Sequence, residues 1–360
     1  MKRLLIVLLI TLMVAASDVY AQQCGCNGVL PVNIGVNVQS PPYMDKARAA
    51  NLGWVRGGVA WREVEPTQGN WVWTHDDTDI RAANAQGLKV LMILGSPPLW
   101  AGGGPNHNKP STNVAWWEEY VRRVAQRYNG IADPSMKVDA YEIWNEPDLE
   151  DSGPGVGWNY PQDTYPRYVD YVHAASVQIR AYAPGTKVVA GAYSAGGSAT
   201  GNSTFRIKRF AESFQKTYYN GINASDFIDV ISLHANGRGD EYSDNVTDRA
   251  KFRIDDHNRF NPRNACKPKW ITEFGYESGP VGEFSQRDRI RRMVEMFAGT
   301  HYGSNCTGFT RGTHRIENAF IYVQAEFMGG GTWGIHRLDG SPKPVVTTYL
   351  RLLPYPASDY

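Results

Sequence analysis

Eight short apolar runs recur along the chain with helical patterns between them, and this recurrence most constrains the fold. The runs are near-continuous stretches of Val, Ile and Leu rather than alternating ones, which is typical of parallel strands buried on both faces. From the second run onward, consecutive runs end about 35–50 residues apart, enough for a crossover helix and a functional loop. We expect strands at 32–38, 54–59, 90–94, 140–143, 188–192, 228–233, 270–271 and 319–323.

Eight strands with intervening helices predict a single (β/α)₈ barrel, an α/β fold, with a doubly wound parallel sheet as the main alternative. The 360 residues are ample for one such barrel and too few for two ordinary enzyme domains with a linker. We expect a signal peptide at 1–21, an N-terminal segment at 22–31 and the barrel at 32–360. Chemistry in such a barrel belongs at the C-terminal ends of the strands.

Two of the intervening segments carry helix signals. Ser111 or Thr112 is suited to cap a helix with an apolar stripe on one face. The sequence from Ser285 to Asp288 has the Ser-x-x-Asp pattern of a helix start. The expected apolar stripes are Trp117, Tyr120, Val121, Val124 and Tyr128 in the first helix, and Ile290, Met293, Val294 and Phe297 in the second.

The first residues have the organisation of a secretory signal. Lys2 and Arg3 precede an apolar run over Leu4–Ala16, and Val19-Tyr20-Ala21 places small residues at the recognition positions for cleavage. The apolar run is too short to remain as a membrane-spanning helix. We therefore expect a secreted protein, extracellular or periplasmic, that has no membrane association once the signal is removed.

Charge and composition narrow the class of partner. Loss of residues 1–21 removes Lys2, Arg3 and Asp18 and leaves 35 basic and 35 acidic side chains. A neutral chain argues against nucleic acid and against a polybasic membrane surface. The 11 Trp, 20 Tyr and 12 Phe suggest a carbohydrate partner, because sugar C–H faces stack on aromatic rings. No nucleotide, esterase or zinc-protease motif is present, so we expect no cofactor. We also expect a monomer.

The four cysteines fit an oxidising compartment. Cys24 and Cys26 lack the second Cys/His pair of a zinc site, so no metal is predicted. Of the three possible pairings, we predict Cys266 with Cys306, because these residues precede neighbouring strands at the same end of the barrel. The bond would close a loop of roughly 40 residues and contribute about 4 kcal/mol. Whether Cys24 and Cys26 then pair with each other stays open.

Two carboxylates end predicted strands on opposite sides of the barrel mouth. The fourth strand leads into Asn145-Glu146-Pro147, and the seventh ends with Glu273. Cleavage of a glycosidic bond needs one protonated and one ionised carboxyl group. Arg56, on the second strand, would keep one of them ionised. Glu142 lies deeper on the fourth strand, and we expect it to be a buried carboxylate paired with a cation of the barrel.

Two segments carry a resemblance to a known group of enzymes. Tyr141–Pro147 and Trp270–Gly275 resemble the acid/base and nucleophile motifs of clan A retaining glycoside hydrolases. The resemblance extends over most of the chain, from about Val32 to Leu352. Parts of Trp61–Trp71 and the segment Ser96–Ala101 look most like families 39 and 5, and the motifs do not decide between these two families.

The resemblance implies roles for individual residues. Glu146 would be the general acid/base and Glu273 the nucleophile of a double displacement. Asn145 would bond the 2-hydroxyl of the sugar, while Arg56 and His234 would lie near the nucleophile. The aromatic candidates for substrate binding are Trp100, Trp158 and Trp333, of which Trp333 would form a platform after the eighth strand.

The sequence also departs from these families. Many family 5 members place a Tyr two residues after the strand-six His, where this chain has Asn236, and Tyr276 or Tyr193 are the possible substitutes. Exo-acting family 39 members usually carry an additional β-domain, and no room remains for one after Tyr360, which favours an open cleft. We expect a secreted retaining glycoside hydrolase that cleaves β-glycosidic bonds of a polysaccharide or oligosaccharide. The alternative is a non-catalytic carbohydrate-binding barrel.

Overall fold

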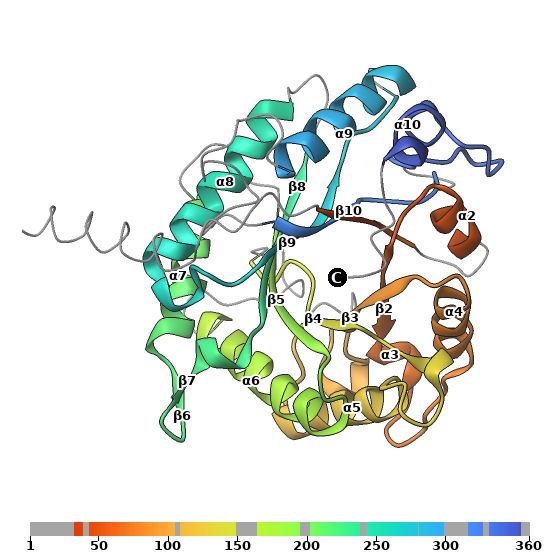
Figure 1. The fold of residues 1–360 in the computed structure, drawn as a ribbon. Helices are drawn as coiled ribbons and strands as arrows, with labels where there is room; N and C mark the ends of the chain where they lie inside the picture. The colour runs from red at the N-terminus through yellow and green to blue at the C-terminus, as the bar shows by residue number, and fades with distance from the viewer. Residues whose placement is uncertain are drawn as a thin grey trace, which may run out of the picture.

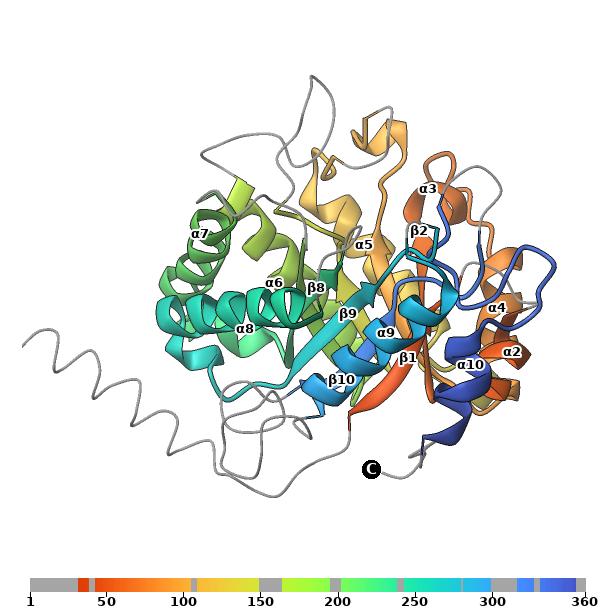
Figure 2. The same cartoon turned by 90° about the horizontal axis from the view of Figure 1, so that it is seen from above.

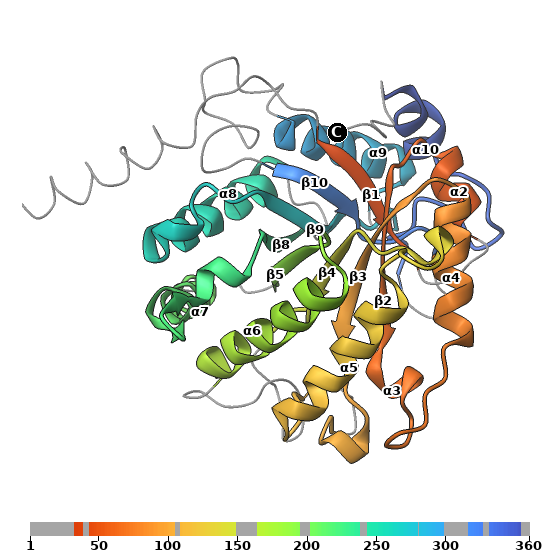
Figure 3. The same ribbon diagram turned by 60° about the horizontal axis from the view of Figure 1, so that its bottom comes forward.

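The computed structural model of this protein describes residues 32–38, 43–104, 109–148, 164–194, 202–237, 243–279, 281–298, 316–326 and 331–353. These residues form a closed barrel of eight parallel strands, hydrogen-bonded in the order β1-β10-β9-β8-β5-β4-β3-β2 (Figures 1 and 3). The prediction of a (β/α)₈ barrel is confirmed. A doubly wound sheet is excluded, because β1 pairs with both β10 and β2 and leaves no open edge.

All eight predicted strands are present: three extend one or two residues beyond the predicted limits, the fourth matches them, the first is shorter, and the sixth and eighth are shifted along the chain by two or three residues. The strand expected at 270–271 is longer, and it runs through the predicted nucleophile. The strands are β1 (Asn33–Asn37), β2 (Trp54–Ala60), β3 (Lys89–Gly95), β4 (Ala140–Ile143), β5 (Lys187–Tyr193), β8 (Val230–Asn236), β9 (Lys269–Gly275) and β10 (Ile316–Ile321).

Helices form a layer outside the barrel (Figures 1 and 2). A short hairpin of β6 (Tyr218–Tyr219) and β7 (Ile222–Asn223) follows α7. Within the described part of the chain, no helix is both long and apolar enough to cross a membrane. The helices are α2 (Met44–Ala49), α3 (Trp61–Val64), α4 (Thr74–Ala85), α5 (Val114–Arg127), α6 (Thr164–Tyr182), α7 (Asn202–Lys216), α8 (Ser243–Phe260), α9 (Glu283–Phe297) and α10 (Pro344–Thr348).

Both helix starts differ from the predictions, although the predicted apolar stripes are buried as expected. Helix α5 is capped by Asn113, whose side chain accepts a hydrogen bond from the backbone N–H of Ala115 at 2.9 Å. Ser111 lies two residues before this cap, and its hydroxyl accepts a hydrogen bond from the backbone N–H of Asn113. Helix α9 begins at Glu283, two residues before the predicted Ser285, with Gly282 at the cap position.

An apolar layer fills one part of the barrel interior. Seven strands each contribute one buried side chain to it: Trp54, Leu91, Ala140, Val189, Val230, Trp270 and Phe320. The eighth strand, β1, contributes Gly35, which lies in register with Trp54 on one side and Phe320 on the other. A Cβ atom at Gly35 would lie 2.6 Å from the Phe320 ring and 2.8 Å from Cβ of Trp54. The missing side chain therefore makes the room that the two large rings occupy.

Just after Ile271, strand β9 contains one residue more than each of its neighbours. Against β8 and against β10, the register shifts by one between Ile271 and the residues that follow it. Trp270 faces the barrel interior, while Ile271 and Phe274 both belong to the apolar cluster outside it. Strict alternation would turn Glu273 outward. The bulge at Thr272–Glu273 reverses the alternation and turns Glu273 into the barrel.

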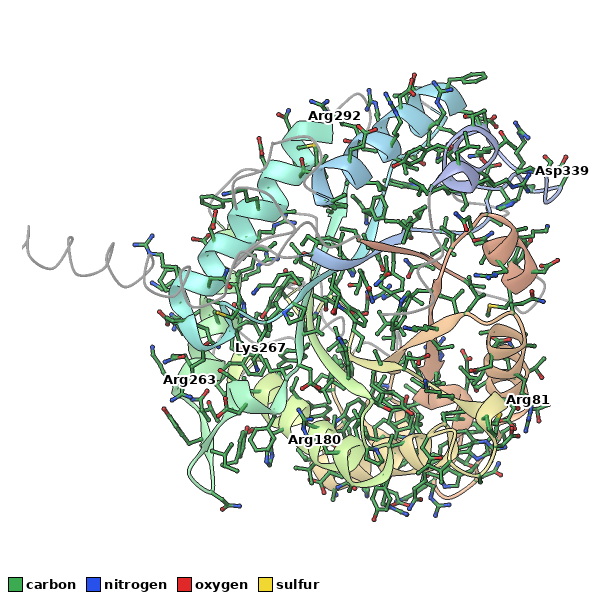
Figure 4. All side chains as sticks on the ribbon, viewed as in Figure 1. Arg81, Arg180, Arg263, Lys267, Arg292 and Asp339 are labelled. Carbon is green, nitrogen blue, oxygen red and sulfur yellow. The ribbon has the colours of Figure 1, made fainter. Side chains whose placement is uncertain are left out.

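Exposed ion pairs are spread over the outer surface. Arg180 pairs with Asp229 at 3.0 Å, and Arg263 lies 3.9 Å from Asp226. Figure 4 places Arg180 and Arg263 at the periphery of the molecule. Because solvent screens such pairs, they contribute little to stability. The buried charges inside the barrel are the ones that carry large electrostatic effects.

Several predictions from the N-terminal and cysteine segments fall outside the described residues. These are the signal peptide at 1–21, the segment at 22–31 and three of the four cysteines. Cys266 lies just before β9, as predicted, and does not have a free thiol. Its predicted partner, Cys306, lies outside the described residues, so the pairing stays a prediction.

Substitution of Gly35 tests the packing of the barrel interior. We expect Gly35→Ala to lower the free energy of unfolding by about 1–3 kcal/mol, because the new methyl group overpacks the layer of Trp54 and Phe320. Gly53→Ala is the matched control, since a Cβ there meets nothing within 4 Å. Urea unfolding of the two variants compares them directly, and equal stabilities would contradict this account of the layer.

Candidate active site

The guanidinium of Arg56 is the centre of a buried polar network at the C-terminal ends of the strands. Its Nε donates to Glu142 at 2.7 Å, and its Nη1 donates to Asn37 at 2.6 Å and to Glu273 at 2.8 Å. Its Nη2 donates to Asn145 at 2.6 Å. Arg56 is 2% exposed and Glu142 is fully buried, so the prediction that Glu142 pairs with a barrel cation is confirmed.

Asn37 fixes the orientation of Arg56, and sequence reasoning missed it. Its side-chain amide donates to the backbone carbonyls of Thr272 at 3.2 Å and Ile321 at 3.0 Å. This leaves its carbonyl oxygen as the acceptor for Arg56. The available signal was its position, since Asn37 ends the first strand and the other site residues also stand at strand ends.

His234 lies between the two predicted catalytic glutamates. Its Nδ1 is 2.9 Å from Glu146 Oε1 and 3.5 Å from Glu273 Oε2, and the three donor atoms all lie within 4.8 Å of one another. The imidazole is completely buried, and Arg253 donates to its backbone carbonyl at 3.2 Å. The structure therefore places Arg56, Asn145, Glu146, His234 and Glu273 close together, and the roles assigned to them stay predictions.

The backbone around Glu146 adopts uncommon conformations. Trp144 has a φ of 71° and Glu146 a φ of 48°, both in the left-handed region. The backbone N–H of Trp144 donates to Leu94 on β3, and that of Glu146 donates to Ala192 on β5. These bonds hold the segment between its two neighbouring strands. Residues with left-handed backbone cost of order 1–3 kcal/mol each and cluster at functional sites.

A further pair of hydrogen bonds anchors this segment two residues beyond Glu146. The carboxylate of Asp148 accepts from the backbone N–H of Ser194 at 2.8 Å and from its hydroxyl at 3.0 Å. Ser194 directly follows β5. The turn that presents Glu146 is therefore tied to β5 at the glutamate itself and to the residue after β5 two positions further on.

The two glutamates differ in their charged neighbours. Burial alone would raise the pKa of Glu273, but the charges of His234 and Arg56 and the hydrogen bonds of Arg56 and Asn236 bring this pKa below its ordinary value. Burial would lower the pKa of His234, and the charges of Glu273 and Glu146 raise it instead. Among the described residues, Arg56 bonds to Glu273 and not to Glu146. Glu273 is thus held ionised.

Glu146, His234 and Glu273 are also the described residues whose geometry suits a metal ion. A metal needs the lone pair of a neutral imidazole. The raised pKa of His234 opposes this, and the positive charge of Arg56 beside Glu273 repels a cation. These residues fit proton chemistry better than metal binding.

Among the described hydrogen bonds of Glu273, none comes from either tyrosine named as a substitute for the strand-six position. Tyr193 and Tyr276 are fully buried, and the Tyr276 ring packs over Gly237. The residue that does approach the nucleophile from the sixth strand is Asn236, whose amide lies 3.5 Å from Glu273.

Tyr322, which directly follows β10, was missed. Its pKa is raised by burial and by the charges of Glu273 and Glu146, so its phenol lies in the field of both carboxylates. Its backbone N–H donates to Phe274, the residue after Glu273, at 2.7 Å. The end of the eighth strand could have indicated it, as the strand ends indicated the other site residues.

The three predicted aromatic binding residues have different surroundings. Trp333 packs edge-on against Tyr322, with ring centroids 5.4 Å apart, and therefore borders the site. The described contacts of Trp100 are with Trp61, Trp116 and the backbone carbonyl of Glu65. They lie in an aromatic cluster near α3 and α5, and none of them is with Glu146 or Glu273. Trp158 lies outside the described residues.

No family model matches the chain, and no curated protein matches it. Solved structures do. A family 39 glycoside hydrolase from Bacteroides cellulosilyticus WH2 superposes with a TM-score of 0.59 at 18% identity, over 88% of this chain and 62% of that one. An exo-β-1,4-mannosidase from an Opitutaceae bacterium, strain TAV5, gives a TM-score of 0.61 at 12% identity, over 89% and 58%.

A psychrophilic family 10 endo-β-1,4-xylanase gives a TM-score of 0.59 at 14% identity, over 88% of this chain and 95% of that one. The chain thus spans less than two thirds of the family 39 enzyme and the mannosidase, and nearly all of the xylanase. These likenesses show the fold alone: the chain has a (β/α)₈ barrel similar to the barrels of these glycoside hydrolases.

Titration of Glu273 tests the electrostatics of the site without any assumption about activity. We expect its carboxyl group to titrate below 4.5, the ordinary value for Glu, in ¹³C NMR spectra assigned with Glu273→Gln. His234→Asn removes the imidazole charge but keeps an N–H donor, and it should raise this pKa. Asn236→Ala, which removes only a 3.5 Å hydrogen bond, should have a smaller effect.

The lowered pKa of Glu273 also makes the stability of the protein depend on pH. The contribution of Glu273 to the free energy of unfolding is complete above its pKa in the unfolded chain, and it is lost as the pH falls through its pKa in the folded protein. An unchanged Glu273 titration in His234→Asn would contradict the assigned charge pairing.

Proposed function

We propose that this protein is a retaining glycoside hydrolase that cleaves β-glycosidic bonds. The observation that carries the proposal is the approach of Glu146 and Glu273, whose carboxylate oxygens lie within 4.8 Å of each other across His234. Carboxyl groups about 5–5.5 Å apart are typical of retaining enzymes, and inverting enzymes need roughly 6.5–9.5 Å to admit a water molecule. This close approach of two carboxylate oxygens supports direct attack by a carboxylate over attack by an intervening water.

Glu273 is the proposed nucleophile. It is held ionised by Arg56 and His234, and a carboxylate must be ionised to attack an anomeric carbon. Its side chain is 12% exposed, so a sugar in the barrel mouth would reach it. Attack would form a bond between Glu273 and the anomeric carbon as the bond to the leaving oxygen breaks.

Glu146 is the proposed general acid and base. With 23% of its side chain exposed, it is the more accessible of the two glutamates. Five ionisable side chains contact one another in a row with alternating charge: Glu142, Arg56, Glu273, His234 and Glu146. The net charge of this row is zero when His234 is protonated and the carboxyl group of Glu146 also carries a proton. That proton would pass to the leaving oxygen, and Glu146 would then take a proton from the water that releases the sugar.

The neighbouring side chains support sugar binding. Asn145 is exposed and held at 2.6 Å by Arg56, so its amide N–H₂ group is oriented with its oxygen engaged. In the resemblance described above, this Asn bonds the sugar 2-hydroxyl. Trp333 and Tyr322 present an aromatic wall next to Glu273, which suits the C–H face of a sugar ring.

We also propose that the enzyme is secreted and acts on a polysaccharide. The basic residues, apolar run and small residues of 1–21 support export. One of the similar structures is an endo-β-1,4-xylanase, which makes a polysaccharide the first substrate to test. Screening a panel of β-linked polysaccharides for released oligosaccharides tests this directly.

Alanine variants of the two glutamates should fail in different ways. We expect Glu146→Ala to lose about 10²–10⁴-fold on substrates with poor leaving groups. It should retain activity on dinitrophenyl glycosides, which depart without protonation, and recover further with azide. Glu273→Ala should be inactive on both, because no covalent intermediate forms.

The surface variant Glu212→Ala, on α7, is the control and should behave as the wild type. If the wild-type protein binds sugars without turning any of them over, the non-catalytic barrel is the correct description. Full activity of Glu273→Ala would refute the assignment of the nucleophile.

The stereochemistry of the first product tests the mechanism. Proton NMR during hydrolysis of a β-glycoside should show the β-anomer first, with the α-anomer appearing only by mutarotation. The expected retention follows from two inversions at the anomeric carbon. If the α-anomer forms first, water attacks directly and Glu273 acts as a base.

A further inference from the structure

The loop Gly331–Gly334, between β10 and α10, carries Trp333 and packs against the segment after β9. The backbone N–H of Ser278 donates to Thr332 O at 3.0 Å, and the Trp333 ring lies edge-on to Tyr322. A Cβ atom at Gly275 would lie 3.8 Å from the Trp333 indole. Gly275 is two residues from Glu273, so the position of this loop sets the distance between the indole and the nucleophile.

Gln286, on α9, holds the loop through its side-chain amide. It is completely buried, and its Nε2 lies 2.7 Å from the backbone carbonyl of Tyr276 and 3.2 Å from that of Trp333. The carbonyls of Thr332 and Gly334 are also within 3.5 Å of it. One amide group therefore connects the segment after β9 to the segment after β10.

Lys343 holds the same loop from the other side. Its Nζ donates to Ser278 Oγ at 2.9 Å and to the carbonyl of Thr332 at 3.1 Å, and it forms an ion pair with Glu326 at 2.6 Å. The side chain is completely buried. A buried cation is costly, and a pair of apolar residues would serve stability as well. This chain nevertheless uses a lysine, which requires a fixed arrangement of acceptors around it.

We propose that Lys343 and Gln286 are positioning residues for substrate binding, which fix the loop Gly331–Gly334 so that Trp333 forms one wall of the sugar site. The proposal rests on the function proposed above and deepens it. Neither residue touches the reacting groups among the described contacts. Their effect on the reaction therefore passes through Trp333, and it should appear in KM and not in kcat.

A purely structural role makes a different prediction. If Lys343 only stabilised the fold, its loss would lower the melting temperature and the active fraction, which reduces kcat without changing KM. If it acts through Trp333, its loss has no further effect on KM once the indole is gone. A double-mutant cycle separates these cases.

The experiment compares Lys343→Met, Trp333→Ala and the double variant on one aryl glycoside. We expect Lys343→Met to raise KM about tenfold with kcat changed less than about threefold, and to raise KM less than about twofold in the Trp333→Ala background. Lys216→Met, a 72% exposed lysine on α7, is the control. Additive effects of Lys343→Met and Trp333→Ala, or an unchanged KM, would overturn the proposal.

Gln286→Leu is the second variant, because Lys343→Met leaves Glu326 without its cation and risks misfolding. Gln286→Leu removes the amide bonds without leaving a buried charge. It should give the same pattern in KM. A wild-type KM in a folded Gln286→Leu protein would remove Gln286 from the proposal.

Hydrogen exchange tests the positioning without any assay of activity. The amide of Ser278 donates to Thr332, whose carbonyl both Lys343 and Gln286 contact, so it reports where the loop lies. It should exchange faster in both variants, while the amide of Tyr322, bonded to Phe274, should not change. If no glycoside is hydrolysed by the wild type, the proposed function fails and this measurement still decides the positioning. Unchanged exchange at Ser278 would refute it.

Discussion

The site depends on one buried cation that serves two carboxylates. Arg56 reaches Glu142 on β4 and Glu273 on β9, and it also bonds Asn37 and Asn145. Burying a charge without a partner would cost several kcal/mol, so the buried guanidinium needs these acceptors. Together they restrict it to one orientation. Glu142 is fully buried, so a substrate would not reach its bond to Arg56. Its effect is to hold Arg56 where the bond to Glu273 requires it.

His234 extends this arrangement to the second glutamate. Because it contacts Glu146 and Glu273 together, the charges alternate from the fully buried Glu142 to the partly exposed Glu146. A proton entering from the solvent side meets Glu146 first. The difference in exposure, 12% for the side chain of Glu273 and 23% for that of Glu146, distinguishes two chemically identical side chains. This asymmetry is what acid–base and nucleophilic roles need.

The sequence predicted the architecture and the central site residues because both leave local signals. Parallel strands buried on two faces produce continuous apolar runs, and side chains at their ends identify the mouth of the barrel. The orientation of Glu273 leaves no such signal. It depends on the bulge at Thr272, and counting from Trp270 by strict alternation would turn Glu273 outward. The resemblance to known motifs supplied what alternation could not.

The residues that were missed depend on contacts between distant segments. Asn37 matters because of its bonds to Thr272 and Ile321, which lie more than 200 residues away in sequence. Tyr322 matters because β10 lies next to β9. Trp100 also follows a strand end, and its described contacts lie in the aromatic cluster around Trp61. A position near a strand end therefore does not by itself show that a residue belongs to the site.

The barrel separates the groups that stabilise it from those that react, and Arg56 stands at the boundary. Two residues before it on β2, Trp54 belongs to the apolar layer that Gly35 makes room for. The polar groups around Arg56 and this apolar layer are thus carried by the same strand. Four oxygen acceptors engage the guanidinium. The low polarity of the layer below strengthens each of those bonds. The packing of the apolar layer and the electrostatics of the site are therefore coupled through β2, and a change such as Gly35→Ala that disturbs Trp54 acts on a strand that also carries Arg56.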